Sequence, residues 1–127
     1  MTDMRTPLGK VRGLGSAKDG TEHFWRQRVT AVANVPLTIF FIGLIIALNG
    51  ASYDEVQAAL SNPFVALLTM GAILSALYHM KLGMQVIIED YIHDDAWKFL
   101  LVMLNTFFVA SVGLLSVFAL LKLAFAG

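Results

Sequence analysis

The sequence predicts an all-α membrane protein with three transmembrane helices, and three observations support this fold class. The 127 residues are 57% hydrophobic and only 14% charged, whereas a soluble domain carries about 25% charged residues. Three apolar runs have the length of about 20 residues that a bilayer crossing requires. The chain has no cysteine, which excludes disulfides, iron–sulfur clusters and thiolate metal sites built by this chain alone.

The three apolar runs lie at about 29–48, 64–91 and 99–122. They leave no room for a separate soluble domain, so we expect a basic tail with an interfacial segment (1–28) and one transmembrane domain (29–127). Six of the nine Lys and Arg residues precede the first run. That run is full length and no small-residue cleavage site follows it, which favours a retained span over a cleaved signal.

The first span is expected to begin behind an anchor segment at the membrane surface. Trp25 and Arg28 belong to this segment, because aromatic and cationic residues commonly mark the edge of a span. Pro36 lies inside the span, a position that membrane helices tolerate better than soluble ones. Thr30 is polar and should face other protein rather than lipid.

Short polar segments separate the spans. Residues 51–62 contain acidic residues but no Lys or Arg, and we expect a loop there with one short interfacial turn. Pro63 is well placed to begin the second helix. Residues 93–96 form a tight polar connection, in which Asp94 or Asp95 is expected to cap the third helix.

The distribution of positive charge predicts the topology. Lys and Arg are enriched in the cytoplasmic segments of membrane proteins, so the basic tail and the side that carries Lys98 should be cytoplasmic, and the 51–62 loop outside. The N-terminus is then cytoplasmic and the C-terminus outside. The polar cluster at the end of the second span, 89–91, falls on the cytoplasmic side.

His79 is an ionisable residue inside the second apolar run, and such residues mark functional sites in membrane proteins. Eleven residues separate it from Asp90, which places Asp90 about 16 Å further along a helix and on nearly the same face, together with Gly83. A neutral imidazole flanked by small residues suits the ligation of heme iron. Lys81 lies about 200° around the helix from His79 and should snorkel or form an ion pair.

Two interpretations of His79 remain open from the residues themselves. The histidine could bond a backbone or hydroxyl group of a neighbouring helix, or it could be one axial ligand of a heme. His93 lies about 21 Å further along, and His23 belongs to the tail. If two histidines hold a heme, the second must come from another chain. Residues 89–91 at the end of the helix also have two interpretations: a solvated helix terminus, or part of a quinone site.

The pattern from His79 through Gly83-Met84 to Asp90-Tyr91 resembles the small, D-type cytochrome b membrane-anchor subunits of succinate dehydrogenase (respiratory complex II). A second patch agrees, in which Asp19-Gly20 precedes an aromatic segment and Arg28-Val29-Thr30-Ala31 opens the first span. The resemblance covers about residues 14–100 in layout, and its specific motifs are confined to these two patches.

The resemblance implies roles for five residues. His79 would be an axial ligand of heme b, Arg28 would lie near the heme propionates, Tyr91 would bond ubiquinone and Asp90 would support that site. The tail histidine of the family falls on the position before His23, so a propionate contact by His23 requires a shift of one residue. Lys81 occupies a position that is often aromatic in the family, from which it could reach a propionate or a lipid phosphate.

The resemblance also implies the partners and the location of the chain. A larger cytochrome b anchor subunit would supply the second heme histidine, a flavoprotein subunit would oxidise succinate, and an iron–sulfur subunit would deliver electrons to the quinone. This chain would contribute to quinone reduction without succinate chemistry of its own. Because no transit peptide is evident, a bacterial inner membrane is favoured over a mitochondrial one. Lipid is the only other partner expected, and no nucleic acid is implicated.

Two further classes of function compete with this interpretation. A small structural or regulatory membrane subunit without a cofactor would use His79 for packing. A component of an oligomeric transporter would use His79 and Lys81 to line a polar pathway. The sequence leaves the physiological direction of the reaction and the quinone type undetermined.

Overall fold

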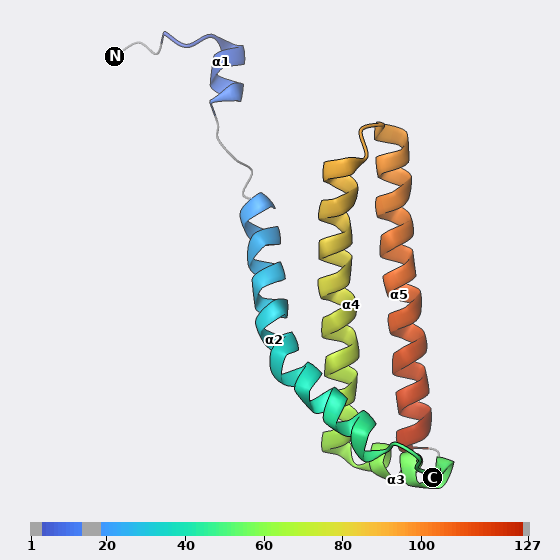
Figure 1. Ribbon diagram of the computed structural model, residues 1–127. Coiled ribbons are helices and arrows are strands. Elements are labelled where there is room, and N and C mark those ends of the chain that lie inside the picture. Colours follow the sequence, from blue (N-terminus) through green and yellow to red (C-terminus); the bar gives the residue numbers. More distant parts are fainter. Residues whose placement is uncertain (1–3, 14–18, 126–127) are drawn as a thin grey trace.

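A computed structural model describes residues 4–13 and 19–125. Every regular element in these ranges is a helix, and the order is α1 (Pro7–Arg12), α2 (Asp19–Ala47), α3 (Tyr53–Ser61), α4 (Pro63–Tyr91) and α5 (Asp95–Phe125) (Figure 1). Three of them, over Gly20–Ala47, Pro63–Tyr91 and Asp95–Phe125, are long and apolar enough to span a membrane. The predicted all-α class with three transmembrane helices is confirmed, and the protein is a multi-pass membrane protein.

The helix of the first span begins earlier than the apolar run that predicted it. α2 already includes the polar and aromatic residues from 19 to 28. Glu22 forms an ion pair with Arg26 one turn later, a spacing that supports helix formation. α2 bends about halfway along its length (Figure 1), where Pro36 lies inside the helix. Proline lacks the N–H group that would bond the preceding turn, which accounts for the bend.

The connection between the first two spans is more ordered than the sequence indicated. α2 ends at Ala47, and Gly50 adopts a positive φ of 80° in the turn that follows. A complete helix, α3, then replaces the predicted loop. Its N-terminus carries a capping box, in which the Ser52 side chain accepts from the Glu55 N–H and the Glu55 side chain accepts from the Ser52 N–H. These reciprocal bonds satisfy two N–H groups that would otherwise lack partners.

The boundaries of α4 and α5 match the turn chemistry predicted for them. Pro63 occupies the first turn of α4, and the Asn62 side chain caps it by accepting from the N–H of Phe64. Asp94 caps α5, because its Oδ1 accepts from the Trp97 N–H at 2.9 Å. The tight 93–96 connection therefore makes α4 and α5 an antiparallel helical hairpin (Figure 1).

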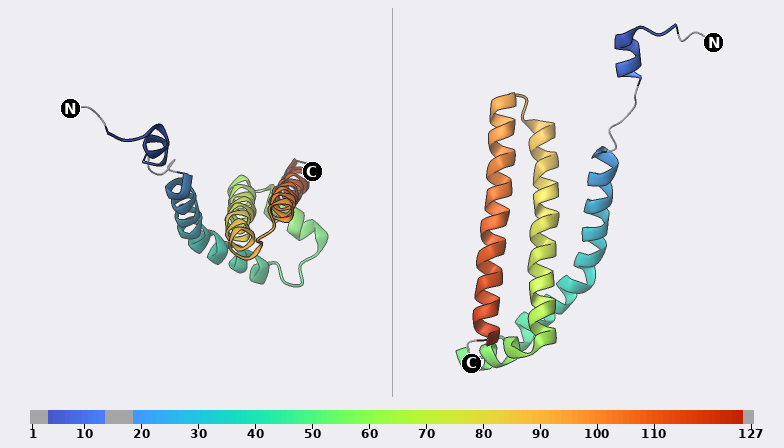
Figure 2. Two further views of the ribbon diagram at one scale, coloured as in Figure 1. Left: turned by 90° about the horizontal axis from the view of Figure 1, so that it is seen from above. Right: turned by 180° about the vertical axis from the view of Figure 1, so that it is seen from behind.

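α4 is the central helix of the chain. It packs against α2, α5 and α3, and α3 also packs against α5, whereas α2 and α5 share no contact in the described part of the chain. Viewed from above, α2 and α5 stand at separate sides of α4 (Figure 2). The few buried side chains lie mainly along α4 and include Leu82 and Ile88. Most of the apolar surface therefore faces outward, as lipid and partner helices require.

Candidate functional site

His79 meets the first span through a hydrogen bond. Its Nδ1 atom lies 3.0 Å from the hydroxyl oxygen of Thr30 on α2, and both side chains are half-buried. The prediction that Thr30 faces protein is confirmed. The contact also realises the simpler of the two interpretations of His79, a bond to a hydroxyl on a neighbouring helix. It does not exclude ligation, because a metal-bound histidine usually uses its other nitrogen for such a bond.

The surroundings of Thr30 indicate which partner donates the proton in the Thr30–His79 hydrogen bond. The Thr30 hydroxyl lies 2.8 Å from the backbone carbonyl oxygen of Arg26, and threonine in a helix commonly donates its proton to the preceding turn. When it does so, its lone pair accepts from the Nδ1–H group of His79. The proton then resides on Nδ1, which leaves the Nε2 lone pair of a neutral ring free to bind a metal.

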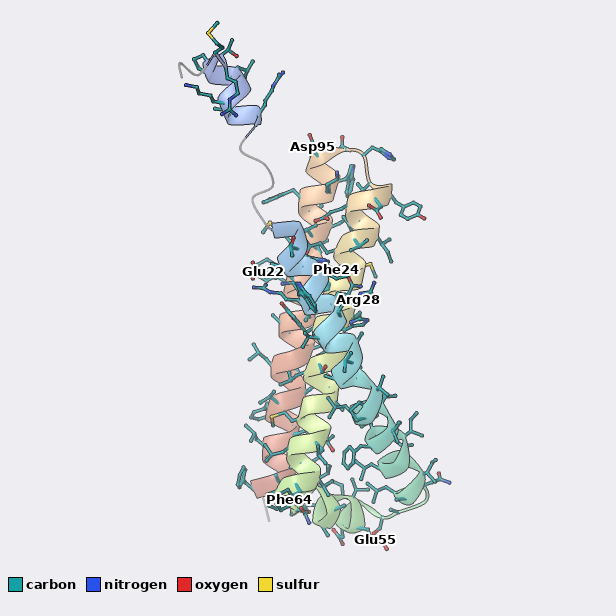
Figure 3. The ribbon with its side chains drawn as sticks, turned by 90° about the vertical axis from the view of Figure 1, so that its left-hand side faces the viewer. Glu22, Phe24, Arg28, Glu55, Phe64 and Asp95 are labelled. Atoms are coloured by element: carbon teal, nitrogen blue, oxygen red, sulfur yellow. The ribbon has the colours of Figure 1, made fainter. Side chains whose placement is uncertain are left out.

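A groove of about 350 Å³ lies beside His79, between α2 and α4. We call it the His79 groove, and its lining residues are Phe24, Gln27, Arg28, Ala31 and His79. The guanidinium carbon of Arg28 lies 4.9 Å from the centre of the Phe24 ring, a cation–π contact that holds the charge near the groove. Figure 3 looks onto α2 and shows Arg28 and Glu22 at opposite edges of this helix.

The structure thus brings two of the predicted site residues, His79 and Arg28, to one groove. His23 lies elsewhere: it lines a different pocket together with Lys81, and its Nε2 atom is buried without a hydrogen-bond partner among the described residues. His93 is exposed in the connection after α4. No group of three or more His, Cys, Asp or Glu residues in the described ranges could hold a metal ion. The His79 groove therefore offers one histidine ligand from this chain.

Tyr91 and Asp90 stand at the last turn of α4. Tyr91 is 75% exposed and forms part of a second groove of about 400 Å³ between α4 and α5, otherwise lined mainly by apolar side chains such as Ile87, Leu104 and Phe108. Asp90 is exposed, and its side chain makes no hydrogen bond or ion pair with another described residue. A phenol at the mouth of an apolar groove can donate to the carbonyl of a ligand whose hydrophobic part lies below it.

Sequence reasoning did not pair the polar residues of the two spans. Thr30 bonds His79, and one turn earlier a guanidinium nitrogen of Arg26 lies 3.4 Å from the Tyr78 hydroxyl. Each partner was visible as a polar residue, but their pairing was not. The predicted spans place Thr30 at the start of 29–48 and His79 well inside 64–91, so the two seemed to lie at different depths. Their depths match only because α2 begins at Asp19, and the rotation of each helix about its axis also had to come from the structure.

The fold and these grooves define a class of protein: a small multi-pass membrane subunit, with a lone histidine facing a groove between its first two spans. The chain belongs to the family of succinate dehydrogenase/fumarate reductase transmembrane subunits, whose family model matches residues 2–114. This membership confirms the resemblance that the His79 to Tyr91 pattern indicated.

Individual relatives agree with the family match. The succinate dehydrogenase hydrophobic membrane anchor subunit of Paracoccus denitrificans is 34% identical over 93 residues, which cover 73% of this chain and 72% of the relative. The corresponding subunit of Rickettsia bellii is also 34% identical, over 90 residues that cover 71% and 72%. The membrane anchor subunit of Reclinomonas americana is 30% identical over 83 residues. No solved structure matches the chain.

Proposed function

We propose that this chain is the small membrane-anchor subunit of a succinate dehydrogenase, and that His79 supplies one axial ligand to a heme b held between this chain and a larger anchor subunit. The observation that carries the proposal is the position of the His79 imidazole, which is bonded on one nitrogen and lines a groove. Its Nδ1 atom is engaged by Thr30, and its ring lines a groove that Arg28 also lines. One nitrogen is oriented and the other is left for iron.

The residues of the His79 groove fit the chemistry of this cofactor. When bound, heme b supplies one-electron redox chemistry next to the quinone site. Arg28 provides a guanidinium that can pair with a propionate carboxylate, and its contact with Phe24 restricts where that charge can go. Gly83 faces Gln27, one of the residues that line the groove, and a Cβ added at Gly83 would meet the Gln27 side chain at 3.9 Å, an ordinary van der Waals distance.

The missing second ligand supports the need for a partner anchor subunit. His23 and His93 do not line the His79 groove, so a bis-histidine heme would draw its other imidazole from a different chain. Within the described helices, the candidate spans are almost wholly unburied, with 0%, 11% and 11% of their apolar windows inside the structure. Such exposed spans suit a subunit that packs against further transmembrane helices.

We propose that the end of α4 contributes to the ubiquinone site. The Tyr91 hydroxyl would donate a hydrogen bond to a quinone carbonyl oxygen, and the neighbouring Asp90 would orient the site or relay protons to it. The apolar groove below Tyr91 would accommodate the hydrophobic part of the substrate. This chain would thereby position and protonate the quinone.

The remaining partners follow from this role. An iron–sulfur subunit would dock at the side of the membrane where α4 ends, and a flavoprotein subunit bound to it would oxidise succinate. The assembly would serve the tricarboxylic acid cycle and respiratory electron transport. The membrane would be a bacterial inner membrane, and the charge distribution supports a topology with the N-terminus in the cytoplasm. The family match favours this function over the transporter component considered from the sequence.

The test is the heme b absorption spectrum of the complex purified with all its subunits. His79→Ala should abolish the heme b bands, because no other histidine of this chain lines the groove. His93→Ala is the matched control, since it removes an exposed histidine from the α4–α5 connection, and it should leave the bands unchanged. Full heme content in an assembled His79→Ala complex would overturn ligation by His79.

A further inference from the structure

A polar pocket lies between α2 and α4 on the side of α4 that does not carry the His79 groove. Its volume is about 260 Å³. We call it the Lys81 pocket, and its lining residues are Glu22, His23, Arg26, Tyr78, Lys81, Leu82 and Gln85. None of them lines the His79 groove. The opposite orientation of Lys81 and His79 agrees with the rotation of about 200° between them.

Two polar groups in the Lys81 pocket have no partner among the described residues. The Nε2 atom of His23 is buried and bonds nothing. Lys81 is half-buried, and its ammonium group takes part in no hydrogen bond or ion pair with the described residues. An unpaired cation and an orphaned ring nitrogen are costly in an apolar setting. Their proximity indicates that an acceptor with negative charge belongs between them.

The other polar side chains of the pocket, Glu22, Arg26, Tyr78 and Gln85, already have partners. Arg26 forms an ion pair with Glu22 and bonds the Tyr78 hydroxyl, and Gln85 donates to Glu89 at 2.8 Å. The Glu22 carboxylate is thus balanced by Arg26, which leaves Lys81 as the uncompensated positive charge. The Tyr78 hydroxyl accepts from Arg26 and keeps its own proton available for a ligand.

The register of the helices sets the depth of the pocket. Arg26 contacts Tyr78 and Thr30 contacts His79, so residues 22–28 of α2 stand beside residues 78–85 of α4. Trp25, which is 61% exposed, and the two arginines of this segment are typical of the membrane surface. The Lys81 pocket therefore lies toward the membrane surface at which α2 begins, and the long Lys81 side chain can reach lipid headgroups there although its backbone lies inside the α4 span.

We propose that the Lys81 pocket binds the phosphodiester of an anionic phospholipid. Lys81 provides the positive charge, His23 and Tyr78 provide donors, and Arg26 lies within the same pocket to strengthen the field. A phosphodiester offers several strong acceptors to these groups, and anionic lipids are drawn to basic residues at the membrane surface. The lipid thus completes the α2–α4 contact on the face opposite the His79 groove.

The experiment measures phospholipid retained by the purified complex. The whole complex is exchanged into detergent, supplied with phosphatidylglycerol, washed, and analysed by native mass spectrometry. The unmodified complex should retain phosphatidylglycerol, and Lys81→Met should lose it at least tenfold more readily. Lys98→Met is the matched control, because Lys98 lies on the same side of the membrane but outside the pocket, and it should retain the lipid. Lys81→Arg should restore retention.

Further arms separate the competing explanations. Inorganic phosphate should not displace the lipid at equal concentration, because it lacks acyl chains that partition into the bilayer; displacement would identify a free phosphate as the ligand and overturn the lipid assignment. Equal lipid retention in all variants would also overturn it, as would loss of a protein subunit from Lys81→Met without loss of lipid. If Lys81→Met fails to assemble, His23→Gln provides the same comparison, with heme absorbance reporting an intact His79 groove.

Discussion

At the scale of single residues, the Thr30–His79 bond links the first two spans and orients the imidazole. Hydrogen bonds between transmembrane helices contribute on average only about 0.6 kcal/mol to stability. A bond this weak adds little to the folding of α2 against α4. Its larger consequence is local: when Thr30 donates its proton to the Arg26 carbonyl, the His79 proton resides on Nδ1 and Nε2 is free.

The first prediction isolates this orienting role. Thr30→Val keeps the shape of the side chain and removes the hydroxyl that bonds the Nδ1 atom of His79. Loss of such an outer-shell partner typically lowers metal affinity by about 10- to 100-fold, so heme should transfer faster from the purified variant complex to a competing heme-binding protein. Thr38→Val, on the same helix but outside the His79 groove, should behave like the unmodified complex. Equal transfer rates for all three would contradict the proposed tautomer.

The second prediction concerns the quinone end of α4. Tyr91→Phe removes only the hydroxyl proposed to donate to the substrate, and one neutral hydrogen bond is worth about 0.5–1.5 kcal/mol. Quinone reduction by the complex should fall about 2- to 12-fold, while reduction of an artificial dye by the soluble subunits should not change. Tyr53→Phe, at the opposite end in α3, should affect neither assay. A parallel loss in both assays would instead indicate defective assembly.

At the scale of elements, α3 shows how a short polar segment can become a helix. Its nine residues are too few to be stable alone, and two features compensate. The capping box of Ser52 and Glu55 satisfies the first N–H groups, and α3 packs against both α4 and α5. Hydrogen bonds from the Ser52 backbone N–H and hydroxyl lower the pKa of Glu55 below its ordinary value of 4.5.

The third prediction follows from the sign of this pKa shift. A carboxylate whose pKa is lowered by folding stabilises the folded state at pH above its unfolded pKa, and this contribution is lost as pH falls through the lowered value. The thermal stability of the protein in detergent should therefore decline from pH 4.5 downward. Glu55→Gln keeps the capping-box geometry without a titrating group and should show a smaller decline. Identical pH profiles for the two proteins would argue against the Ser52–Glu55 contact.

At the scale of the whole molecule, the open arrangement around α4 sets the orientation of every site. The His79 groove and the Lys81 pocket are lined by residues of the first half of α2, and Tyr91 lies at the last turn of α4. α2 begins and α4 ends at the same end of the bundle (Figure 1). The Ser52 cap lies at the other end. A topology with the N-terminus in the cytoplasm would direct all three sites toward the soluble subunits.

The fourth prediction tests that topology. Because the chain has no cysteine, a single introduced thiol reports its own side of the membrane. Ala58→Cys in α3 should react with a membrane-impermeant maleimide in intact cells, whereas Ala96→Cys at the start of α5 should react only after the cells are opened. Both positions are exposed, so accessibility alone cannot explain a difference. The reverse pattern would invert the assigned orientation.

Much of this architecture could be predicted from the residues. Apolar runs predict spans reliably, because the backbone of a lipid-exposed segment must satisfy its hydrogen bonds within a helix. Pro63 and Asp94 predicted helix starts, because proline fits the first turn of a helix and an aspartate side chain can cap it. The early start of α2 and the complete helix α3 were not predicted, although Ser52 followed three residues later by Glu55 is a sequence signature of a helix start. The packing of α3 against α4 and α5 could come only from the structure. For the site, the residue type identified His79 and the family resemblance identified Arg28, but only the packing showed that they share a groove and that His23 does not line it.

The lack of contact between α2 and α5 in the described structure has a consequence for the life of the protein in the cell. A copy without the proposed partner anchor would leave much of α4 and the arginine beside the His79 groove facing lipid. Cells continuously remove membrane and soluble proteins that persist in incompletely packed states. The level of this subunit should therefore follow the supply of its partner rather than its own rate of synthesis, so that surplus copies are degraded and the two anchors accumulate in equal amounts.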